Sequence, residues 1–327
     1  MSVAVARASD DKPRQILPSR GPADRLYRRL ATGAGLLTLV ILFLIGLFLV
    51  VRAWPAFQLM GLAFFDTSGW QPDGLTHRFG IAAILYWTMV IAAIALAIAV
   101  PVSIATALFI NEYAPRSIQR PLIALVDLLA AIPSVIYGIW GLAFLEPHFV
   151  GLSDWMTTNL GFIPIFSTDG PNFAGSAFIV GVAVSLMVQP ICTSVMREVF
   201  SQTPPAEKEA ALALGASRWG MIRTVVLPFG SGGIIGGSML GLGRALGETI
   251  AVALIVSPVT VISPRILQSG ANSVAALIAL QFGESSQQYG IPALMAAGLS
   301  LFVVTLVVNF IASLIVARSR SGKGVEI

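Results

Sequence analysis

The chain has 327 residues, of which 56% are hydrophobic and 11% are charged, and its mean hydropathy is +0.84. Soluble domains average about 25% charged residues, so this composition excludes an ordinary soluble domain and indicates a protein that crosses a membrane several times. The net charge of +4 comes from basic residues in short segments between apolar runs, which is the distribution that orients a membrane protein, so we expect no nucleic-acid partner.

Residues 1–32 form a polar segment with seven basic residues and three prolines, and prolines disfavour a helix. We expect a mostly disordered cytoplasmic tail here, followed by a first transmembrane helix at residues 33–51. The tail is too long for an ordinary secretory signal, so this helix should remain as an uncleaved anchor. Trp54 and Trp70, in the loop that follows, suit a membrane–water interface.

Five further apolar runs bring the number of predicted transmembrane helices to six. They cover residues 79–110, 122–145, 174–196, 229–257 and 293–316. Pro133 should break the third of them, and residues 146–172 are predicted to form the loop that follows it. In the long loop after the fifth span, residues 271–282 are apolar enough for a short re-entrant or interfacial helix.

Basic residues are distributed unevenly over the segments between the spans. Sixteen lysines and arginines lie in the two tails, residues 111–121 and residues 197–228, whereas the loops on the other side hold three. The positive-inside rule then places both termini in the cytoplasm, together with the polar loop at residues 204–228.

The loop at residues 204–228 has the pattern of two short helices joined by a turn. Two prolines and Glu207 form a start signal for a first helix, and Gly215 supplies a turn position after it. Ser217 is suited to cap a second helix, which Pro228 should end. The sequence therefore predicts a helix-turn-helix outside the membrane.

Nothing in the sequence indicates a catalytic centre. It contains no G-x-x-x-x-G-K-[ST] phosphate-binding loop, so any ATP hydrolysis, with its ATP and Mg²⁺, belongs to another subunit. A serine nucleophile elbow, a zinc-binding histidine pair and a convincing pair of catalytic carboxylates are also missing. Cys192 is the single cysteine, which excludes a disulfide or a cysteine-based metal site within one chain. We expect no enzyme activity, no metal and no cofactor in this chain.

Three charged residues fall inside predicted spans, where each charge costs about 2.5 to 3.5 kcal/mol on insertion scales. Arg244 and Glu248 lie in the fifth span at a spacing that places them on one face of a helix, one turn apart. Asp127 lies in the first turns of the third span, where Arg116 or Arg120 could neutralise it. Charges inside a membrane are functional by default. Arg244 and Glu248 could instead only neutralise each other within one helix, and for Asp127 a structural role is equally open.

The fifth span is rich in glycine. Gly233, Gly237 and Gly241 recur at every fourth position, and Gly243 and Gly247 form a second pair of the same spacing. Such small-residue faces let helices approach closely. We expect them to pack against helices of this chain and also against a second subunit.

The loop at residues 204–228 carries a family motif made of an acidic residue, two alanines and a later glycine. These residues are Glu209, Ala210, Ala211 and Gly215. Together with the Leu-Pro pair that ends the loop, they resemble the EAA loop of ABC importer permeases. In that family the loop is the coupling helix, which docks in a groove on a separate ATPase. The resemblance therefore implies that these four residues couple the chain to an ATPase.

Two further segments narrow the resemblance. Residues 128–138 (LLAAIPSVIYG) and 243–252 (GRALGETIAV) closely match permeases of phosphate ABC transporters. The chain is similar to this Pst-type family, and more to its PstC branch than to PstA. The resemblance covers residues 75–318, which are expected to form an ABC transporter type-1 transmembrane domain, followed by a cytoplasmic tail at residues 319–327. Asp127 stands where the family is expected to carry glutamate.

The resemblance implies an all-α integral protein of the bacterial inner membrane with the type I ABC importer permease fold. It implies a permease subunit of an ATP-driven phosphate importer, which works with a PstA-like second permease, a PstB-like ATPase dimer and an external PstS-like phosphate-binding protein. In that role Arg244, Glu248 and Asp127 would line the translocation pathway, and Pro133 and the glycine-rich fifth span would let helices break and slide. A permease for another oxyanion (molybdate, sulfate or phosphonate) is the alternative, and a secondary transporter is a more distant one.

The distribution of basic residues predicts which positions are accessible from outside the cell. In a Cys192→Ala background, single cysteines at Thr168 and Gln287 should react with a membrane-impermeant thiol reagent added to intact cells, and a cysteine at Ser217 should react only after permeabilisation. Labelling of Ser217→Cys from outside would overturn the orientation.

Overall fold

The computed structural model describes residues 21–318, and the predictions made for residues 1–20 and for the tail at 319–327 lie outside this range. The described part is helical, with isolated β-bridges and no named strand. The chain divides into two compact units, Met1–Phe48 and Leu49–Ile327. The second unit contains every element from α2 onward.

Helix α1 covers Pro22–Met60 and carries the first apolar run. The predicted disorder is therefore wrong for residues 22–32. Pro22 does not oppose the helix, because it occupies the first helical position, where a missing N–H removes no helical hydrogen bond. The residues that follow are good helix formers: Ala23, Arg25, Leu26, Arg28 and Arg29. The predicted loop after the first span is also shorter than expected, since the helix continues to Met60.

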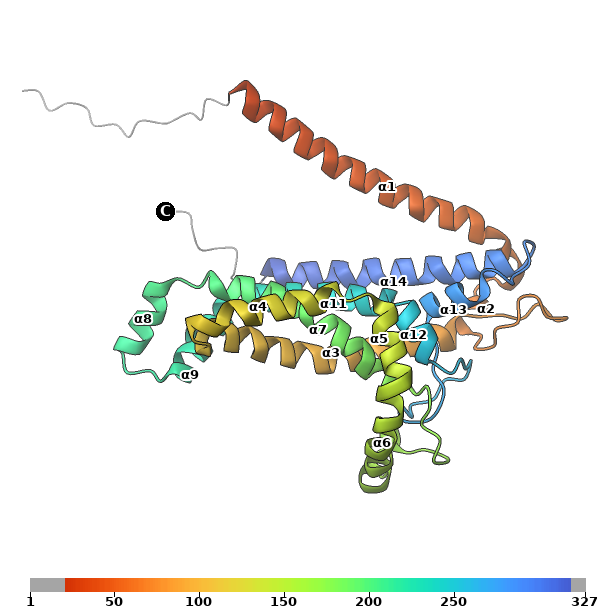
Figure 1. The fold of residues 1–327 in the computed structure, drawn as a ribbon. Helices are drawn as coiled ribbons and strands as arrows, with labels where there is room; N and C mark the ends of the chain where they lie inside the picture. Colours follow the sequence, from red (N-terminus) through yellow and green to blue (C-terminus); the bar gives the residue numbers. More distant parts are fainter. Residues whose placement is uncertain (1–20, 319–327) are drawn as a thin grey trace, which may run out of the picture. The chain divides into compact units, whose positions relative to one another are not determined.

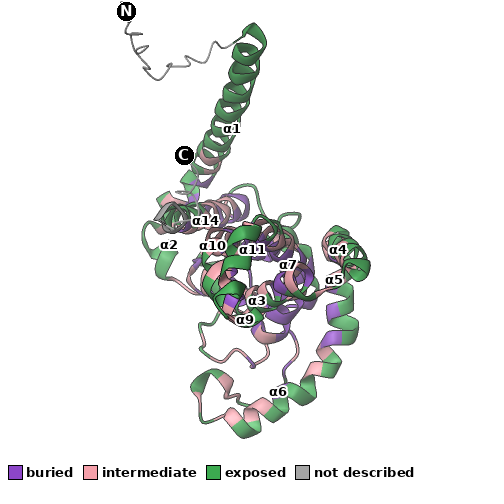
Figure 2. Ribbon diagram, turned by 90° about the vertical axis from the view of Figure 1, so that its left-hand side faces the viewer, coloured by how far each residue is buried: buried purple, intermediate pink, exposed green. Residues whose placement is uncertain are grey.

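The second unit is built around four long helices: α3 (Ala82–Leu108), α7 (Ala177–Ser201), α11 (Ser231–Gly247) and α14 (Gly290–Arg318). These helices run side by side in Figure 1, and α3 and α7 share the most extensive contact. A Cβ added at Gly181 of α7 would lie 2.5 Å from Ile94 of α3, so the two backbones approach closely. Figure 2 shows the buried residues gathered where α3, α7 and α11 meet.

The glycine stripe of α11 packs against α7. A Cβ added at Gly241 would lie 2.5 Å from the Cys192 Sγ of α7, one at Gly233 would lie 2.5 Å from Val199 of the same helix, and one at Gly237 would lie 3.3 Å from the Cys192 carbonyl. The predicted close packing on this chain's own helices is confirmed. The second pair, Gly243 and Gly247, has no packing neighbour within 4 Å of its Cβ positions among the described residues. One side of α11 is therefore packed and the other is open.

The third predicted span is broken where the sequence indicated. Helix α4 (Arg116–Ala131) ends just before Pro133, and α5 (Ser134–Trp140) begins just after it. The prediction of a loop from residue 146 is wrong, because the chain continues through a π-helical turn, η2 (Gly141–Leu145), into α6 (Glu146–Leu160). A proline near the start of α6 is tolerated because the π turn before it already interrupts the regular hydrogen-bond ladder. Figure 1 shows α5 and α6 turned away from the direction of α4.

The glycine-rich fifth span is also broken, as expected for a span that lets helices break, although the position of the break at Glu248 was not predicted. Helix α11 ends at Gly247, Glu248 is extended (ψ 125°), and a short helix α12 covers Ile250–Ile255. Segment α12 packs against α5: a Cβ added at Gly138 would lie 2.9 Å from the Ala251 Cα. The helical segments that follow the two breaks are therefore direct neighbours.

The remaining elements are short: α2 (Ala63–Asp66), η1 (Phe109–Tyr113), η3 (Pro164–Phe166), α8 (Pro205–Ala213), α9 (Arg218–Met221), η4 (Ile222–Val226), α10 (Leu227–Phe229) and α13 (Val274–Gln281). Helix α13 confirms the predicted short helix in the long loop. Residues 53–81, α13 and α14 share a second apolar cluster. Trp70 is buried in this cluster and donates its indole N–H to the Gln281 Oε1 at 2.7 Å, so its predicted interfacial position is wrong.

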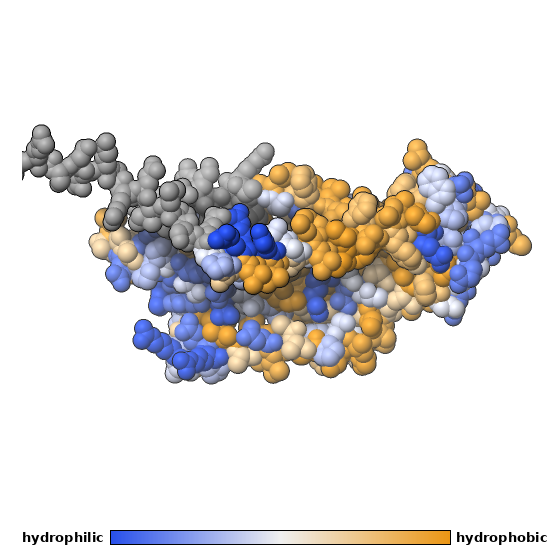
Figure 3. Space-filling view, turned by 90° about the horizontal axis from the view of Figure 1, so that it is seen from above, coloured by the Kyte–Doolittle hydropathy of each residue, from blue (hydrophilic) through white to orange (hydrophobic). Residues whose placement is uncertain are grey.

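Five helices in the described residues are long and apolar enough to span a membrane, and the number is six if the bent pair Arg218–Phe229 and Ser231–Gly247 counts as one span. Hydrophobic side chains spread widely over the surface drawn in Figure 3. A soluble protein rarely exposes such broad apolar patches, whereas lipid requires them. The structure therefore agrees with a polytopic membrane protein.

The two sides of α11 should respond differently to a methyl group. Gly241→Ala places a methyl against Cys192, and such overpacking typically costs about 1–3 kcal/mol. Gly236→Ala is the matched control, because its Cβ position has no neighbour within 4 Å in the described structure and alanine favours a helix by about 1 kcal/mol over glycine. Thermal unfolding in detergent should show a lower Tm for the first variant and an equal or higher Tm for the second. Equal effects of the two variants would contradict the packing.

Candidate functional site

Helices α8 and α9, with the turn between them, form a hairpin at residues 205–221, here called the α8–α9 hairpin. Gly215 in its turn has φ +87°, a conformation that side chains disfavour. The Ser217 Oγ accepts the Gly220 N–H at 3.1 Å and caps α9. The predicted helix-turn-helix, its glycine turn and its serine cap are confirmed.

The α8–α9 hairpin projects from one end of the helix bundle (Figure 1) and carries an exposed apolar patch. Leu214 is 90% exposed and Trp219 is 56% exposed. Glu209 and Ala210 are exposed beside them, while Ala211 is half-buried. Apolar side chains rimmed by polar ones mark a protein-interaction surface.

The hairpin is joined to the bundle through a continuous helical path. Segments α9, η4 and α10 run from Arg218 to Phe229 and meet α11 at an angle of 65°. Gly230 lies at this bend, where a Cβ would lie 2.3 Å from the Phe200 ring of α7. The hairpin is therefore connected directly to α11, and the bend between them packs against the end of α7.

Arg244 lies in the last turn of α11, on the open side of that helix. It lines a groove of about 590 Å³ together with side chains from three helices: Ile191 of α7, Gly236, Met239, Leu240 and Gly243 of α11, and Asn309 of α14. Its Nε is buried and makes no hydrogen bond within the described part of the chain. Because Arg244 also lines the groove, its planar guanidinium is suited to bind an oxyanion there.

Glu248 lies in the break between α11 and α12, and its side chain is buried. Its Oε1 accepts the Ala251 N–H at 3.4 Å, so the carboxylate caps the start of α12. No ion pair joins Glu248 to Arg244 among the described residues, and the predicted single helical face is wrong because α11 ends between them. Each charge instead lies at a helix end that stabilises its sign. Arg244 lies at the C-terminus of α11, where the helix dipole favours a cation, and Glu248 lies at the N-terminus of α12, where it favours an anion.

Asp127 and Pro133 belong to the third predicted span. Asp127 is exposed on α4 in the isolated chain, and residues 21–318 contain no ion pair between it and Arg116 or Arg120. Pro133 lies in the break, which Tyr137 bridges by donating its hydroxyl to the Leu129 carbonyl at 3.0 Å. The structure therefore gives Pro133 a clear conformational role, and the roles of Asp127, Arg244 and Glu248 in a pathway remain predictions.

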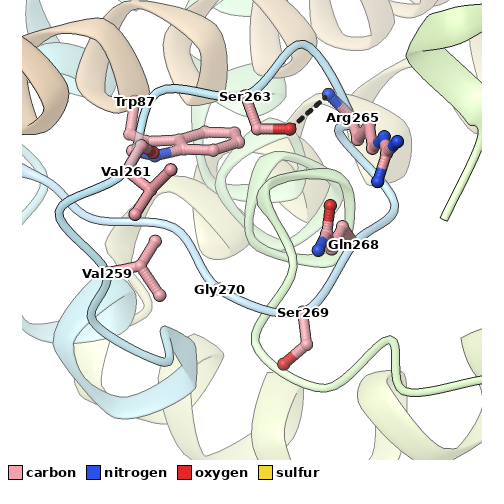
Figure 4. A pocket seen from close by; sticks show the side chains of 8 residues that line it. All are labelled: Trp87, Val259, Val261, Ser263, Arg265, Gln268, Ser269 and Gly270. Atoms are coloured by element: carbon pink, nitrogen blue, oxygen red, sulfur yellow. Dashed lines mark hydrogen bonds between the residues drawn. The ribbon is translucent and has the colours of Figure 1, made fainter. Parts of the chain in front are cut away.

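A loop at residues 256–273 lies toward the other end of α3. The Trp87 indole N–H donates to the Val261 carbonyl at 2.8 Å, and the Tyr86 hydroxyl donates to the Ser263 carbonyl at 2.9 Å. The loop encloses a pocket of about 210 Å³, where Figure 4 shows Trp87 opposite the polar residues Arg265 and Gln268. Two aromatic side chains of α3 therefore hold this loop in place.

Arg265 ties this loop to residues 163–174. Its guanidinium pairs with the Asp169 carboxylate, and this hydrogen bond lowers the pKa of Asp169 below its ordinary value. The Ser269 Oγ also donates to the Ala174 carbonyl at 2.7 Å. Neither the loop contacts nor the pocket were found from the sequence, since the partners lie far apart along the chain.

The fold and these sites define a membrane component of a transport complex. Residues 99–321 match the family described as binding-protein-dependent transport system inner membrane component. The match covers more than half of the chain, which therefore belongs to this family of ABC transporter permeases. It is accordingly a multi-pass inner-membrane permease component.

The relatives are phosphate transport system permease proteins. The chain is 38% identical to PstC 2 of Mycobacterium tuberculosis (strain ATCC 25618 / H37Rv) over 95% of this chain and 98% of the relative. It is 39% identical to PstC of Xylella fastidiosa (strain 9a5c), over 92% and 93% of the two chains. PstC of Haemophilus influenzae is 36% identical, over 92% and 95%. The predicted resemblance to the PstC branch is confirmed.

A solved structure supports the fold independently. The chain matches a bacterial ABC transporter involved in the import of the acidic polysaccharide alginate, with a TM-score of 0.58 and 22% identity over 90% of this chain and 98% of that chain. At this identity the match concerns the fold alone. The predicted ABC importer permease fold is confirmed.

Proposed function

We propose that this chain is the permease subunit of an ATP-driven phosphate importer. The observation that carries the proposal is the identity of 36–39% to PstC proteins over more than nine-tenths of the chain. The chain forms the translocation pathway with a PstA-like second permease and receives phosphate from an external PstS-like binding protein. ATP is hydrolysed by a separate PstB-like ATPase dimer, which also holds the Mg²⁺.

The pathway passes along the open side of α11. Arg244 offers its guanidinium to the passing oxyanion there, because a planar fork of donors matches phosphate oxygens. Glu248 fixes the start of α12 and thereby the break beside Arg244. The adjacent breaks at Pro133 and Glu248 are of the kind that transporters place at their substrate sites, where discontinuous helices can rearrange. Asp127 borders the same pathway from α4.

The α8–α9 hairpin docks on the ATPase from the cytoplasmic side. Glu209 and Ala210 lie exposed near its apolar patch, and Gly215 gives its turn the required conformation. The 65° junction with α11 then turns a displacement of the hairpin into a displacement of the helix that carries Arg244. ATP hydrolysis outside this chain is thereby linked to the pathway inside it.

Substrate identity is tested by uptake into proteoliposomes that contain the complete complex with its binding protein. We expect ATP-dependent uptake of radiolabelled phosphate that vanadate inhibits, and no comparable uptake of sulfate or molybdate. Preferred uptake of sulfate or molybdate would show that the transporter's substrate is that oxyanion and not phosphate. Uptake that persists without ATP would contradict the importer class.

The role of Arg244 is tested by Arg244→Lys, which keeps the charge and loses the fork. Phosphate uptake should fall by at least about tenfold, because a hydrogen bond to a charged group contributes about 1.5–3 kcal/mol. Arg78→Lys, an exposed arginine in the loop before α3, is the control and should transport normally. Normal uptake by an assembled Arg244→Lys complex would exclude the direct contact.

The turn of the α8–α9 hairpin is tested by comparing two substitutions of Gly215. Valine should strain the turn by about 1–3 kcal/mol, whereas asparagine tolerates positive φ. Gly215→Val should therefore reduce both ATPase co-purification and stimulation of ATP hydrolysis by the loaded binding protein, and Gly215→Asn should retain most of both. Full stimulation in the valine variant would show that the hairpin is not the docking element.

A further inference from the structure

Three successive residues at the end of α3 each contact a different element. They lie in the π-helical turn η1, which continues α3. The Asn111 Nδ2 donates to the Arg197 carbonyl of α7 at 2.7 Å. The next residue, Glu112, forms an ion pair with α8, and the one after it, Tyr113, contacts α9. Successive helical residues point in different directions, so one short turn can reach three neighbours.

The contact with α8 is an ion pair that is largely shielded from water. The Lys208 Nζ lies 2.5 Å from the Glu112 Oε1, and these side chains are 21% and 8% exposed. When an ion pair is shielded from water, the loss of one partner leaves the other charge uncompensated, which is strongly destabilising. Lys208 is therefore held to η1, whereas Glu209 beside it on α8 is exposed.

The contact with α9 is a cation–π interaction. The Arg218 guanidinium carbon lies 5.0 Å from the centroid of the Tyr113 ring. Such contacts are attractive within about 6 Å. The two contacts hold the hairpin on both sides of its Gly215 turn, so α8 and α9 are attached to the same turn of η1.

Helix α3 with η1 extends over Ala82–Tyr113, a length of about 48 Å at 1.5 Å per residue. Near its other end, Trp87 and Tyr86 hold the loop at residues 256–273 by the hydrogen bonds described above. The same helix is therefore fastened to the hairpin at one end and to this loop at the other.

We infer that Glu112 and Tyr113 form a junction that makes α3 move together with the α8–α9 hairpin, so that α3 is a second transmission element beside α11. Glu112, Lys208, Tyr113 and Arg218 are positioning residues in this account. The inference rests on the proposed role of the hairpin as the ATPase-docking element. It adds a path from that element to the loop at the far end of α3.

The test uses the complete transporter in proteoliposomes and measures phosphate transported per ATP hydrolysed, together with the amount of ATPase that co-purifies. Glu112→Gln and Lys208→Met should retain bound ATPase and lower this ratio by about 5- to 150-fold, the range typical of allosteric coupling. The charge exchange Glu112→Lys/Lys208→Glu should restore most of the ratio. Glu198→Gln, an exposed glutamate near the same end of α7, is the matched control and should behave as wild type.

Tyr113→Leu probes the same junction at an exposed position, where a failure to fold is not expected. It should also lower the ratio, and Tyr113→Phe should retain it because the ring face is kept. Normal ratios in both Glu112→Gln and Tyr113→Leu would overturn the inference, as would impaired single variants that the charge exchange does not restore. Failure of the docking role itself has a separate signature, namely full ATPase stimulation in Gly215→Val.

Discussion

Backbone hydrogen bonding is the constraint on which this structure depends. In lipid, every N–H and C=O must find a partner within the protein, so a spanning segment can leave the helical conformation only where protein or water covers it. This chain interrupts two of its predicted spans, after Ala131 and after Gly247. The segments that follow, α5 and α12, pack against each other, and Glu248 and Tyr137 supply side-chain groups that satisfy backbone partners at the breaks. Both breaks therefore lie where neighbouring helices and side-chain hydrogen bonds from this chain cover the interrupted backbone.

Helix α11 joins this region to the α8–α9 hairpin. Its glycine stripe lets α7 approach closely, while its other side leaves Arg244 at a groove with a buried, unused Nε. The packed side fixes α11 closely against α7, and the open side places Arg244 at the wall of the groove. One helix thereby combines the connection to the hairpin with the guanidinium that we propose faces the substrate.

Features with a local signal were predictable from the sequence. Pro133 breaks a helix because of its ring, and Gly215 and Ser217 form a turn and a cap for reasons that lie within a few residues. The end of α11 also had a local signal. A basic residue in the last turn and a glycine near the end, here Arg244 and Gly247, are typical of a helix C-terminus, and an acidic residue such as Glu248 is typical of the start of the next helix. The apolar pattern of the fifth span concealed it, and Glu248 was consequently assigned to the wrong helix face.

Other features depend on contacts between distant parts of the chain and were not predictable. Lys208 and Glu112 are 96 residues apart, and Trp87 and Val261 are 174 apart. Polarity alone made Trp70 an interfacial residue, whereas tertiary packing buries it. Pro22 shows the opposite error, in which a residue that breaks helices in their interior begins one.

The central claim, that the open side of α11 is the anion pathway, is tested most directly by cysteine accessibility in the assembled transporter. In a Cys192→Ala background, cysteines at Met239 and Gly243 should react with a water-soluble thiol reagent during turnover, and phosphate should slow the reaction, while a cysteine at Phe43 in the first apolar run should not react. Absence of labelling at Met239 and Gly243, or labelling that phosphate does not affect, would contradict the account.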